Sequence, residues 1–172
     1  QKAGEIFDVV DANDQVVGQR TRGEVHAEKL LHRAVHVFVY NKRGDLLLQQ
    51  RSRFKDAHPG VWDSSVAGHL DAGEGYAAAA VRELDEEMGI RVEETPEEIA
   101  RIAPCAETGW EHVRLYRTQY SGGVRHPAAE VEAALWFPVA EIAAWITARP
   151  EDFATGFIEC WKAASDPSHS SL

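Results

Sequence analysis

The chain has 172 residues, of which 44% are hydrophobic and 27% charged, and its formal net charge is −10. This size and composition are typical of one globular domain that buries a continuous core. The acidic balance argues against nucleic acid as a partner, because a phosphate backbone is bound by pooled lysine and arginine. No apolar run reaches the roughly 18 residues needed to cross a bilayer, so no membrane span is expected.

The pattern of apolar, polar and turn-forming residues predicts a mixture of strands and helices. Strands are predicted at residues 5–11, 15–21, 34–41, 45–50, 61–67, 100–106, 113–120 and 131–137. Helices are predicted at residues 74–88, 139–148 and 152–164. Residues 1–164 are expected to form one domain, and the Ser/Pro-rich residues 165–172 a disordered tail. Strands on both sides of one helix favour an α/β fold, an α/β/α sandwich with a mixed sheet.

The helix at 74–88 follows a glycine-rich loop and carries a cluster of acids, Glu83, Glu86 and Glu87, before Gly89 ends it. At about 100° per residue its apolar stripe is predicted to face the core. That stripe comprises Ala77, Val81, Leu84 and Met88. Glu83 and Glu87 are predicted to lie on the adjacent flank of the helix, and the small side chains of Ala79 and Ala80 are expected to leave room above that flank. The carboxylates repel one another, and Arg82 offsets this only in part by pairing with Glu86. A hard divalent cation is the natural counter-ion, because magnesium and manganese prefer carboxylate oxygens.

The segment from Gly68 to Ile90 resembles the Nudix box, the signature of the Nudix hydrolase superfamily. The matching residues are Gly68, Glu74, Arg82, Glu83, Leu84, Glu86, Glu87, Gly89 and Ile90. The resemblance implies a Nudix-type sandwich and magnesium- or manganese-dependent hydrolysis of a diphosphate linked to another moiety. The metal ligands that it implies are Glu83, Glu86, Glu87 and the Gly68 carbonyl. The catalytic candidates are Glu86, Glu83, Arg82 and Glu111, and Glu74 is assigned to positioning the loop.

Several residues outside the box are candidates for binding the substrate. Arg51, Arg53 and Lys55 form a basic run suited to a terminal phosphate, with a solvated strand end as the alternative. Trp62 and Trp110 suit stacking on a base, although packing is the more common role of tryptophan in a domain of this size. The general base stays open among Glu107, Glu111, Glu130 and Glu132.

Residues 31–69 also resemble isopentenyl diphosphate isomerase, a Nudix-fold enzyme that moves a double bond. That resemblance pairs His26, His32, His69 and Glu111 with a separate metal site, although packing or surface roles are favoured here for the histidines. The isomerase uses a cysteine thiol where this chain has Ala67. Hydrolysis is therefore the favoured reaction, with isomerase-like chemistry and a non-catalytic nucleotide-binding module as alternatives.

The remaining expectations concern the cellular location, the partners and the oligomeric state of the protein. Cys105 and Cys160 form neither a disulfide framework nor a metal-binding spacing, which favours a reducing, cytoplasmic location. The expected partner is a small-molecule diphosphate, and both a monomer and a homodimer remain open.

Overall fold

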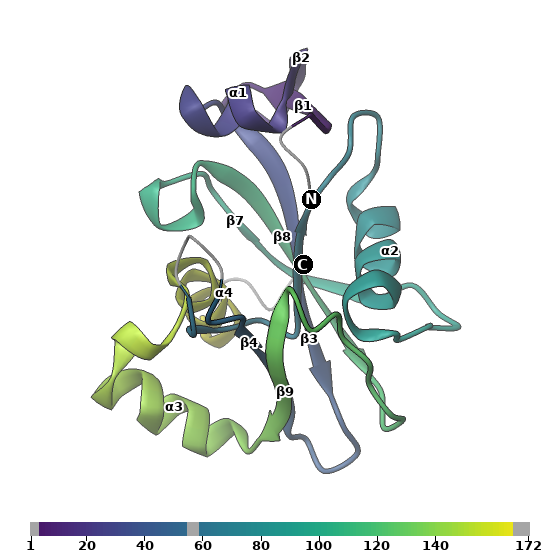
Figure 1. Ribbon diagram of the computed structural model, residues 1–172, viewed down its shortest axis with the longest axis vertical. Helices are drawn as coiled ribbons and strands as arrows, with labels where there is room; N and C mark the ends of the chain where they lie inside the picture. Colours follow the sequence, from purple (N-terminus) through teal and green to yellow (C-terminus); the bar gives the residue numbers. More distant parts are fainter. Residues whose placement is uncertain (1–3, 55–58, 167–172) are drawn as a thin grey trace.

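A mixed β-sheet forms the middle layer of the protein in a computed structural model that describes residues 4–54 and 59–166 (Figure 1). Its central strand, β3 (His32–Tyr40), pairs in parallel with β8 (Glu111–Gln119) and antiparallel with β6 (Val66–His69). The outer strands are β4 (Leu46–Arg51), β5 (Trp62–Asp63), β7 (Glu97–Ile102) and β9 (Val131–Phe137). The order is β5-β4-β3-β8-β7, with β9 paired to β4.

Helices cover both faces of this sheet. Helix α2 (Tyr76–Met88) lies on one face, and α3 (Val139–Ala148) and α4 (Thr155–Ser165) lie on the other, as Figure 1 shows. Two short 3-10 turns, η1 (Ala106–Thr108) and η2 (Pro150–Asp152), complete the α4 side. Alternation along β3 divides its side chains between the two apolar cores, one under α2 and one under α4. The predicted α/β sandwich with a mixed sheet is confirmed.

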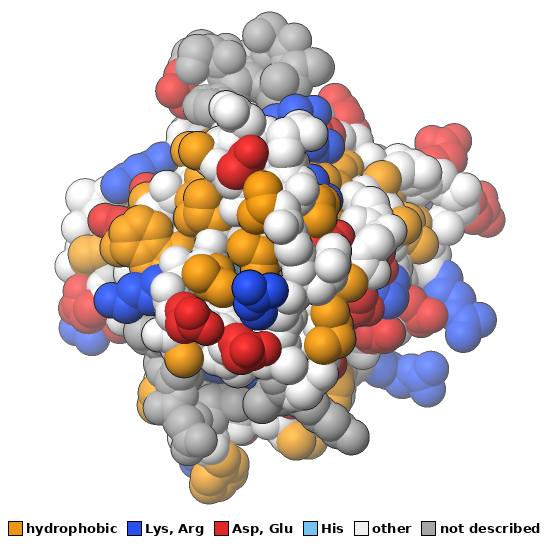
Figure 2. All heavy atoms as spheres, turned by 90° about the horizontal axis from the view of Figure 1, so that it is seen from above, with side chains coloured by type: hydrophobic (Ala, Val, Ile, Leu, Met, Phe, Trp, Pro, Cys, Tyr) orange, Lys and Arg blue, Asp and Glu red, His pale blue; other side chains and the backbone are white. Residues whose placement is uncertain are grey.

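A small N-terminal unit packs against one end of the sandwich. It consists of the hairpin β1 (Ile6–Val10) and β2 (Val16–Thr21), followed by α1 (Arg22–Ala27). The backbone N–H of Ala72 donates to the Ile6 carbonyl at 3.0 Å, which ties the hairpin to the loop before α2. Seen from above, this end shows basic side chains scattered among acidic and apolar ones (Figure 2).

The predicted helix at 74–88 is present, but its buried face is rotated from the one expected. Ala77 and Val81 face solvent, Val81 with 38% of its surface exposed, whereas Ala79 and Ala80 are fully buried. The two small alanines let the helix approach the sheet closely instead of leaving space above it. This rotation carries Glu83 inward, where it is buried. The expected apolar stripe was therefore wrong at Ala77 and Val81.

Other boundaries also differ from prediction. The strand expected at 61–67 is two short strands, because Ser64 and Ser65 interrupt the ladder between β5 and β6. Ser65 Oγ accepts from the Val39 N–H at 2.9 Å and so replaces a strand-to-strand bond. Helix α2 begins two residues later than predicted, after Gly75, and ends at Gly89 as predicted. Helix α4 includes Ser165, which was predicted to belong to the disordered tail, and residues 167–172 of that predicted tail lie outside the described part of the chain.

Candidate functional site

Gly68 and Glu83 make the closest approach between the sheet and α2. A Cβ atom on Gly68 would lie 2.4 Å from Cδ of Glu83, a distance that no side chain tolerates. Only glycine therefore fits at the end of β6 while Glu83 keeps its position, with 5% of its surface exposed. This steric requirement therefore explains why Gly68 and Glu83 occur together in the Gly68–Ile90 segment.

Arg82 organises the acids around it. Its guanidinium donates from Nε and Nη2 to the two carboxylate oxygens of Glu74 at 2.7 and 2.8 Å, and from Nη2 to the His69 carbonyl at 3.2 Å. It also contacts Glu83, and Nη1 donates to Glu86 at 3.1 Å, the pairing predicted from the sequence. Glu74 in turn accepts from the Asp71 N–H at 3.0 Å. This clamp fixes the loop before α2 relative to the acidic end of the helix.

Glu87 reaches from α2 back to the sheet. One of its oxygens accepts from the Ala67 N–H and from Nε2 of Gln49, both at 3.2 Å. Burial raises the pKa of Glu87 well above its usual range, and the neighbouring Glu83 raises it further. Burial also raises the pKa of Glu83, against the lowering effect of Arg82. A divalent cation would relieve this penalty, so the donor set fits magnesium or manganese.

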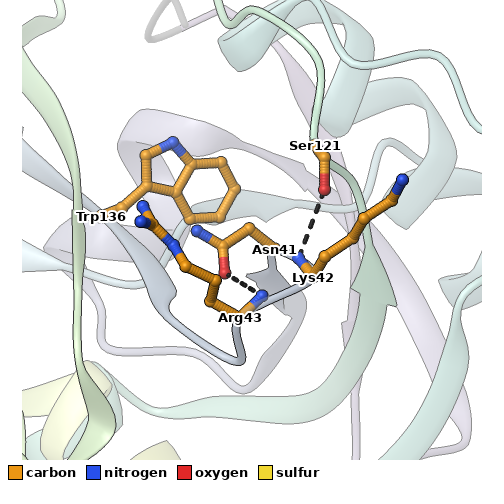
Figure 3. A pocket seen from close by; sticks show the side chains of 5 residues that line it. All are labelled: Asn41, Lys42, Arg43, Ser121 and Trp136. Carbon is orange, nitrogen blue, oxygen red and sulfur yellow. Dashed lines mark hydrogen bonds between the residues drawn. The ribbon is translucent and has the colours of Figure 1, made fainter.

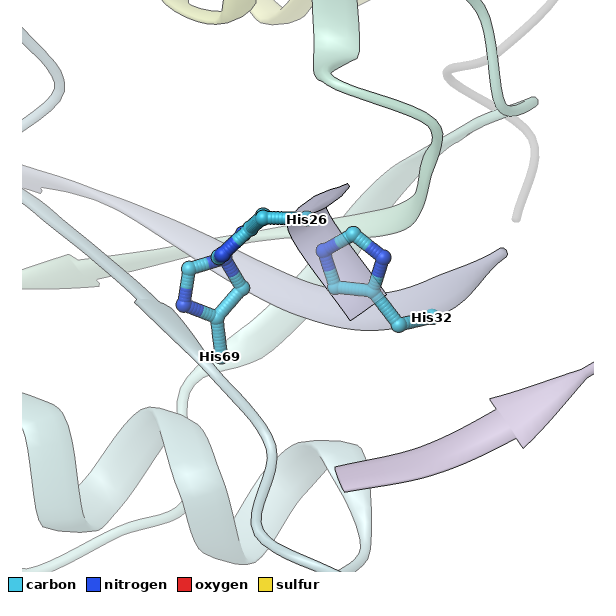
Figure 4. A group of neighbouring side chains, drawn as sticks. All are labelled: His26, His32 and His69. Carbon is cyan, nitrogen blue, oxygen red and sulfur yellow. The ribbon is translucent and has the colours of Figure 1, made fainter. Parts of the chain in front are cut away.

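Three histidines converge on the opposite side of β6. One ring nitrogen from each of His26, His32 and His69 lies within 4.8 Å of the other two, and Figure 4 shows the three rings grouped together. Nε2 of His69 is 2.7 Å from a Glu111 carboxylate oxygen, and Nε2 of His32 is 3.4 Å from the same oxygen. Phe7 covers the group, with its ring centroid 5.0 Å from that of His69. The isomerase-like resemblance had grouped these four residues, and the hydrogen-bonded packing favoured from the sequence is also compatible with this arrangement.

The electrostatics of the histidine group suit metal ligation. Partial desolvation lowers the pKa of His26 to about 4, with His69 adding to the effect, so the ring is neutral near pH 7. Burial alone would raise the pKa of Glu111, but His69 and His32 outweigh it and hold that pKa well below its usual range. The neutral His26 imidazole beside the ionised Glu111 carboxylate suits a divalent cation, for which His32 and His69 offer further nitrogen ligands.

Arg51 and Arg53 of the predicted basic run have different surroundings in the structure. Arg53 forms an ion pair with Glu132, and 70% of its side chain is exposed. Arg51, at the end of β4, acts electrostatically on Asp63. Lys55 lies outside the described residues.

The remaining candidates take different positions. Trp62 packs between Phe137 and Trp145, with ring centroids 5.3 and 5.8 Å away, so the packing alternative applies to it. Trp110 is partly buried, with a left-handed φ of 67°. Of the four candidate bases, Glu111 joins the histidines, whereas Glu107 is linked to α4 by a bond from Thr155 to its carbonyl.

Four polar residues near the site were not among the candidates predicted from the sequence, namely Gln49, Asp63, Ser64 and His36. His36 interrupts the apolar run of β3, which is a signal that could have marked it. Burial raises the pKa of Asp63, and His36 and Arg51 act against that rise. Together these side chains form a row of buried or half-buried polar groups that runs from Glu87 towards α4.

Two cavities lie away from these residues. One of about 330 Å³ is lined by Asn41, Lys42, Arg43, Ser121 and Trp136 at the β3–β4 turn (Figure 3). Another of about 610 Å³ lies beside the β1–β2 turn, where Arg33 and Arg114 surround Asp14. In that second cavity both arginines are already paired, Arg33 with Asp14, and Arg114 with Asp14 and Glu98. Neither cavity is lined by the acids of α2 or by the grouped histidines.

Comparisons with known proteins agree with this geometry. A model of the NUDIX domain matches residues 30–156. An uncharacterized Nudix hydrolase of Streptomyces coelicolor is 33% identical, covering 96% of this chain and 94% of that protein. An isopentenyl-diphosphate Delta-isomerase of Serratia proteamaculans is 32% identical, covering 92% and 90%. The crystal structure of DR0079 from Deinococcus radiodurans has a TM-score of 0.74 at 26% identity, covering 84% of this chain and 90% of that one. A Nudix hydrolase and an isomerase are thus both named among relatives with nearly equal sequence identity to this chain.

Proposed function

The chain belongs to the Nudix domain family, and from this premise we propose that it hydrolyses a diphosphate linked to another moiety, with water attacking phosphorus. The observation that carries the proposal is the complete carboxylate site. Glu83 and Glu87 are held together at the sheet despite the cost of burying two like charges. Natural proteins keep such an arrangement where a cation or a substrate compensates it.

The proposed metal ligands are Glu83, Glu86 and Glu87, with the carbonyl of Gly68, for magnesium or manganese. When bound there, the cation would supply positive charge to phosphate oxygens and lower the pKa of a water molecule. The chain holds the site in place through Arg82, which restrains Glu74 and Glu86, and through Gln49, which restrains Glu87. Arg82 is thus a positioning residue in this proposal.

Proton transfer and phosphate binding are assigned to two further residues. Glu86 has one oxygen bonded to Arg82 and an exposed carboxylate, so it is the proposed acceptor of the proton from water. Glu111 is less suited to that role, because its pKa is depressed by His69 and His32. Arg51 is the proposed contact for a terminal phosphate, since it acts electrostatically on Asp63 and since Arg53 is paired with Glu132.

The test is a screen of diphosphate compounds with magnesium, with the products identified by mass spectrometry. The set contains nucleoside diphosphates and triphosphates, nucleotide sugars, dinucleotide polyphosphates and prenyl diphosphates. The proposal predicts metal-dependent cleavage of one class, lost on chelation. Absence of cleavage across all classes, together with tight binding of one of them, would favour the non-catalytic binding module.

An isomerase-like activity is the second candidate, and the convergence of His26, His32, His69 and Glu111 favours it. Moving an allylic double bond requires an acid and a base on opposite faces of the alkene. Ala67 cannot carry a proton, so we predict no conversion of isopentenyl to dimethylallyl diphosphate. NMR of a reaction in heavy water tests this, because deuterium in the prenyl carbons would establish isomerase chemistry.

The proposal involves no membrane. Within residues 4–54 and 59–166, none of the helices combines the length and the apolar character that crossing a bilayer requires. The hydrolysis of a small diphosphate needs only the site between α2 and the sheet.

A further inference from the structure

Asp8 is a buried carboxylate in the middle of β1 that the proposed hydrolysis does not use. Only 8% of its surface is exposed, although aspartate is disfavoured in strands and a buried carboxylate is costly unless it is hydrogen-bonded. Its Oδ1 accepts from Nε2 of Gln19, the residue opposite it on β2, at 2.9 Å. Its Oδ2 accepts from the backbone N–H of Gly73 at 2.9 Å. One oxygen of Asp8 therefore serves its own hairpin, and the other holds the loop before α2.

The loop before α2 depends on such contacts from outside, because Glu74 lies between two glycines. Gly73 has a left-handed φ of 80°, and glycine is the residue with the widest choice of backbone conformations. Strand β1, which lies beside this loop in Figure 1, accepts two consecutive N–H groups from it. The N–H of Ala72 donates to the Ile6 carbonyl at 3.0 Å, and that of Gly73 donates to Asp8. The backbone that carries Glu74 is thus fixed from β1.

Glu74 passes this restraint on to the acids of α2. Its two carboxylate oxygens occupy Nε and Nη2 of Arg82, while Nη1 of Arg82 reaches Glu83 and Glu86. If Glu74 withdrew, the guanidinium would be free to pair more fully with those two acids. An arginine that does so competes with a divalent cation for the same oxygens. The position of the loop therefore governs how available the carboxylates are to a metal.

We propose that Asp8 is a positioning residue for the carboxylate site. By holding the N–H of Gly73, it keeps Glu74 on Arg82 and leaves the acids of α2 available to a divalent cation. Strand β1 thereby contacts both the carboxylate site and the grouped histidines, since Phe7, which points to the opposite side of the strand, covers the histidines. The inference rests on the proposed function for the identity of the metal-binding acids, but metal affinity is measurable without turnover.

The test is a calorimetric titration of magnesium into the unmodified protein and into Asp8→Leu. Leucine has the branched shape of aspartate but accepts no hydrogen bond, and Asp8→Ala is a second variant that lacks the acceptor and adds no bulk. Magnesium is the probe because it prefers carboxylate oxygens, whereas imidazoles suit transition metals. Glu87→Gln identifies the binding event that belongs to the carboxylate site. The affinity of that event should fall about 10-fold in Asp8→Leu, the scale of one hydrogen bond to a charged group.

Asp8→Asn tests whether the acceptor oxygen is what matters. The asparagine carbonyl can accept from the N–H of Gly73, and the Gln19 amide can turn to accept from the new NH₂ group. We therefore expect Asp8→Asn to retain most of the magnesium affinity that Asp8→Leu loses. A purely structural role would instead lower the melting temperature and leave the affinity of the folded protein unchanged, so thermal unfolding is measured on every variant.

Asp11→Ala is the matched control. The carboxylate of Asp11 also accepts two hydrogen bonds in the same hairpin, from the N–H groups of Asn13 and Gln15 at 2.9 and 3.0 Å. Both of these bonds lie within the β1–β2 turn, so their loss should destabilise the hairpin without releasing the loop before α2. The magnesium affinity of Asp11→Ala should equal that of the unmodified protein.

The outcomes separate this inference from the proposed function. Unchanged magnesium affinity in folded Asp8→Leu or Asp8→Ala overturns the positioning role, as does an equal loss in Asp11→Ala or in Asp8→Asn. Hydrolysis of a diphosphate in the screen would then still support the proposed function. Weaker magnesium binding in Asp8→Leu that Asp8→Asn restores, in a protein that cleaves no diphosphate, would instead preserve the positioning role and remove the hydrolase.

Discussion

The acids of α2 and the grouped histidines are two cation-fitting sites built in opposite ways. The first site lies within about one helical turn of α2 and contains Glu83, Glu86 and Glu87. Packing holds these side chains together, and Arg82 offsets part of their mutual repulsion. The histidines come from α1, β3 and β6, and Glu111 of β8 already contacts two of them. The first site needs a cation to relieve repulsion between carboxylates, whereas the second contains one carboxylate that is already hydrogen-bonded. We therefore expect catalysis to depend far more on the first.

The largest effect is expected from Glu87→Gln. The substitution keeps the shape and the hydrogen-bonding capacity of the side chain but removes a charge from the carboxylate site. Metal-dependent cleavage should fall at least about 100-fold, because a metal contributes several kcal/mol to the transition state. The melting temperature of the metal-free protein should rise, since burial and Glu83 disfavour the Glu87 charge. Steady-state kinetics and thermal unfolding measure both, and full activity of the variant would contradict the comparison.

Gly68→Ala is expected to have the next largest effect. Its methyl group would lie 2.4 Å from Cδ of Glu83, so either β6 or the carboxylate must move. We expect about 1–3 kcal/mol of destabilisation, the usual cost of overpacking, together with loss of cleavage. Denaturant unfolding and kinetics test this, with Gly123→Ala as the control in open space. A stable, active Gly68→Ala variant would show that the close approach is not required.

His69→Ala should separate the two sites. It removes the histidine that contacts Glu111 at 2.7 Å, and the number of divalent ions bound per chain should fall without abolishing cleavage. Equilibrium dialysis followed by metal analysis gives the stoichiometry, and Glu87→Gln provides the matched loss at the other site. If His69→Ala abolishes cleavage as fully as Glu87→Gln does, the two sites act as one and the comparison fails.

The smallest effects concern the basic run. Arg51→Ala should raise KM with little change in kcat, as expected for a residue that binds phosphate equally in the ground state and the transition state. Arg53→Ala should change KM by less than about 2-fold, because an exposed ion pair such as that with Glu132 contributes little. If the two substitutions raised KM equally, Arg51 and Arg53 would instead bind phosphate together.

Periodicity and motifs predicted the local features and the fold class, and the grouping of the histidines was suggested only by resemblance to the isomerase. The helix end at Gly89, the Arg82–Glu86 pair and the fold class follow from periodicity and from a compact motif. The rotation of α2 depends on Ala79 and Ala80 packing against the sheet, which periodicity alone does not contain. The gathering of His26 with His69 depends on how α1 docks beside β6. Propensity does not report such tertiary placements.

The most direct test of the central claim is cleavage in oxygen-18 water of whichever diphosphate the screen identifies, followed by mass spectrometry of the products. Water attack on phosphorus at the carboxylate site predicts one labelled oxygen in a phosphate-containing product, with magnesium required and with the label incorporated at least about 100-fold more slowly by Glu87→Gln. Label in the non-phosphate product would place the attack on carbon. That result, or label incorporated by Glu87→Gln at the unmodified rate, would contradict the account.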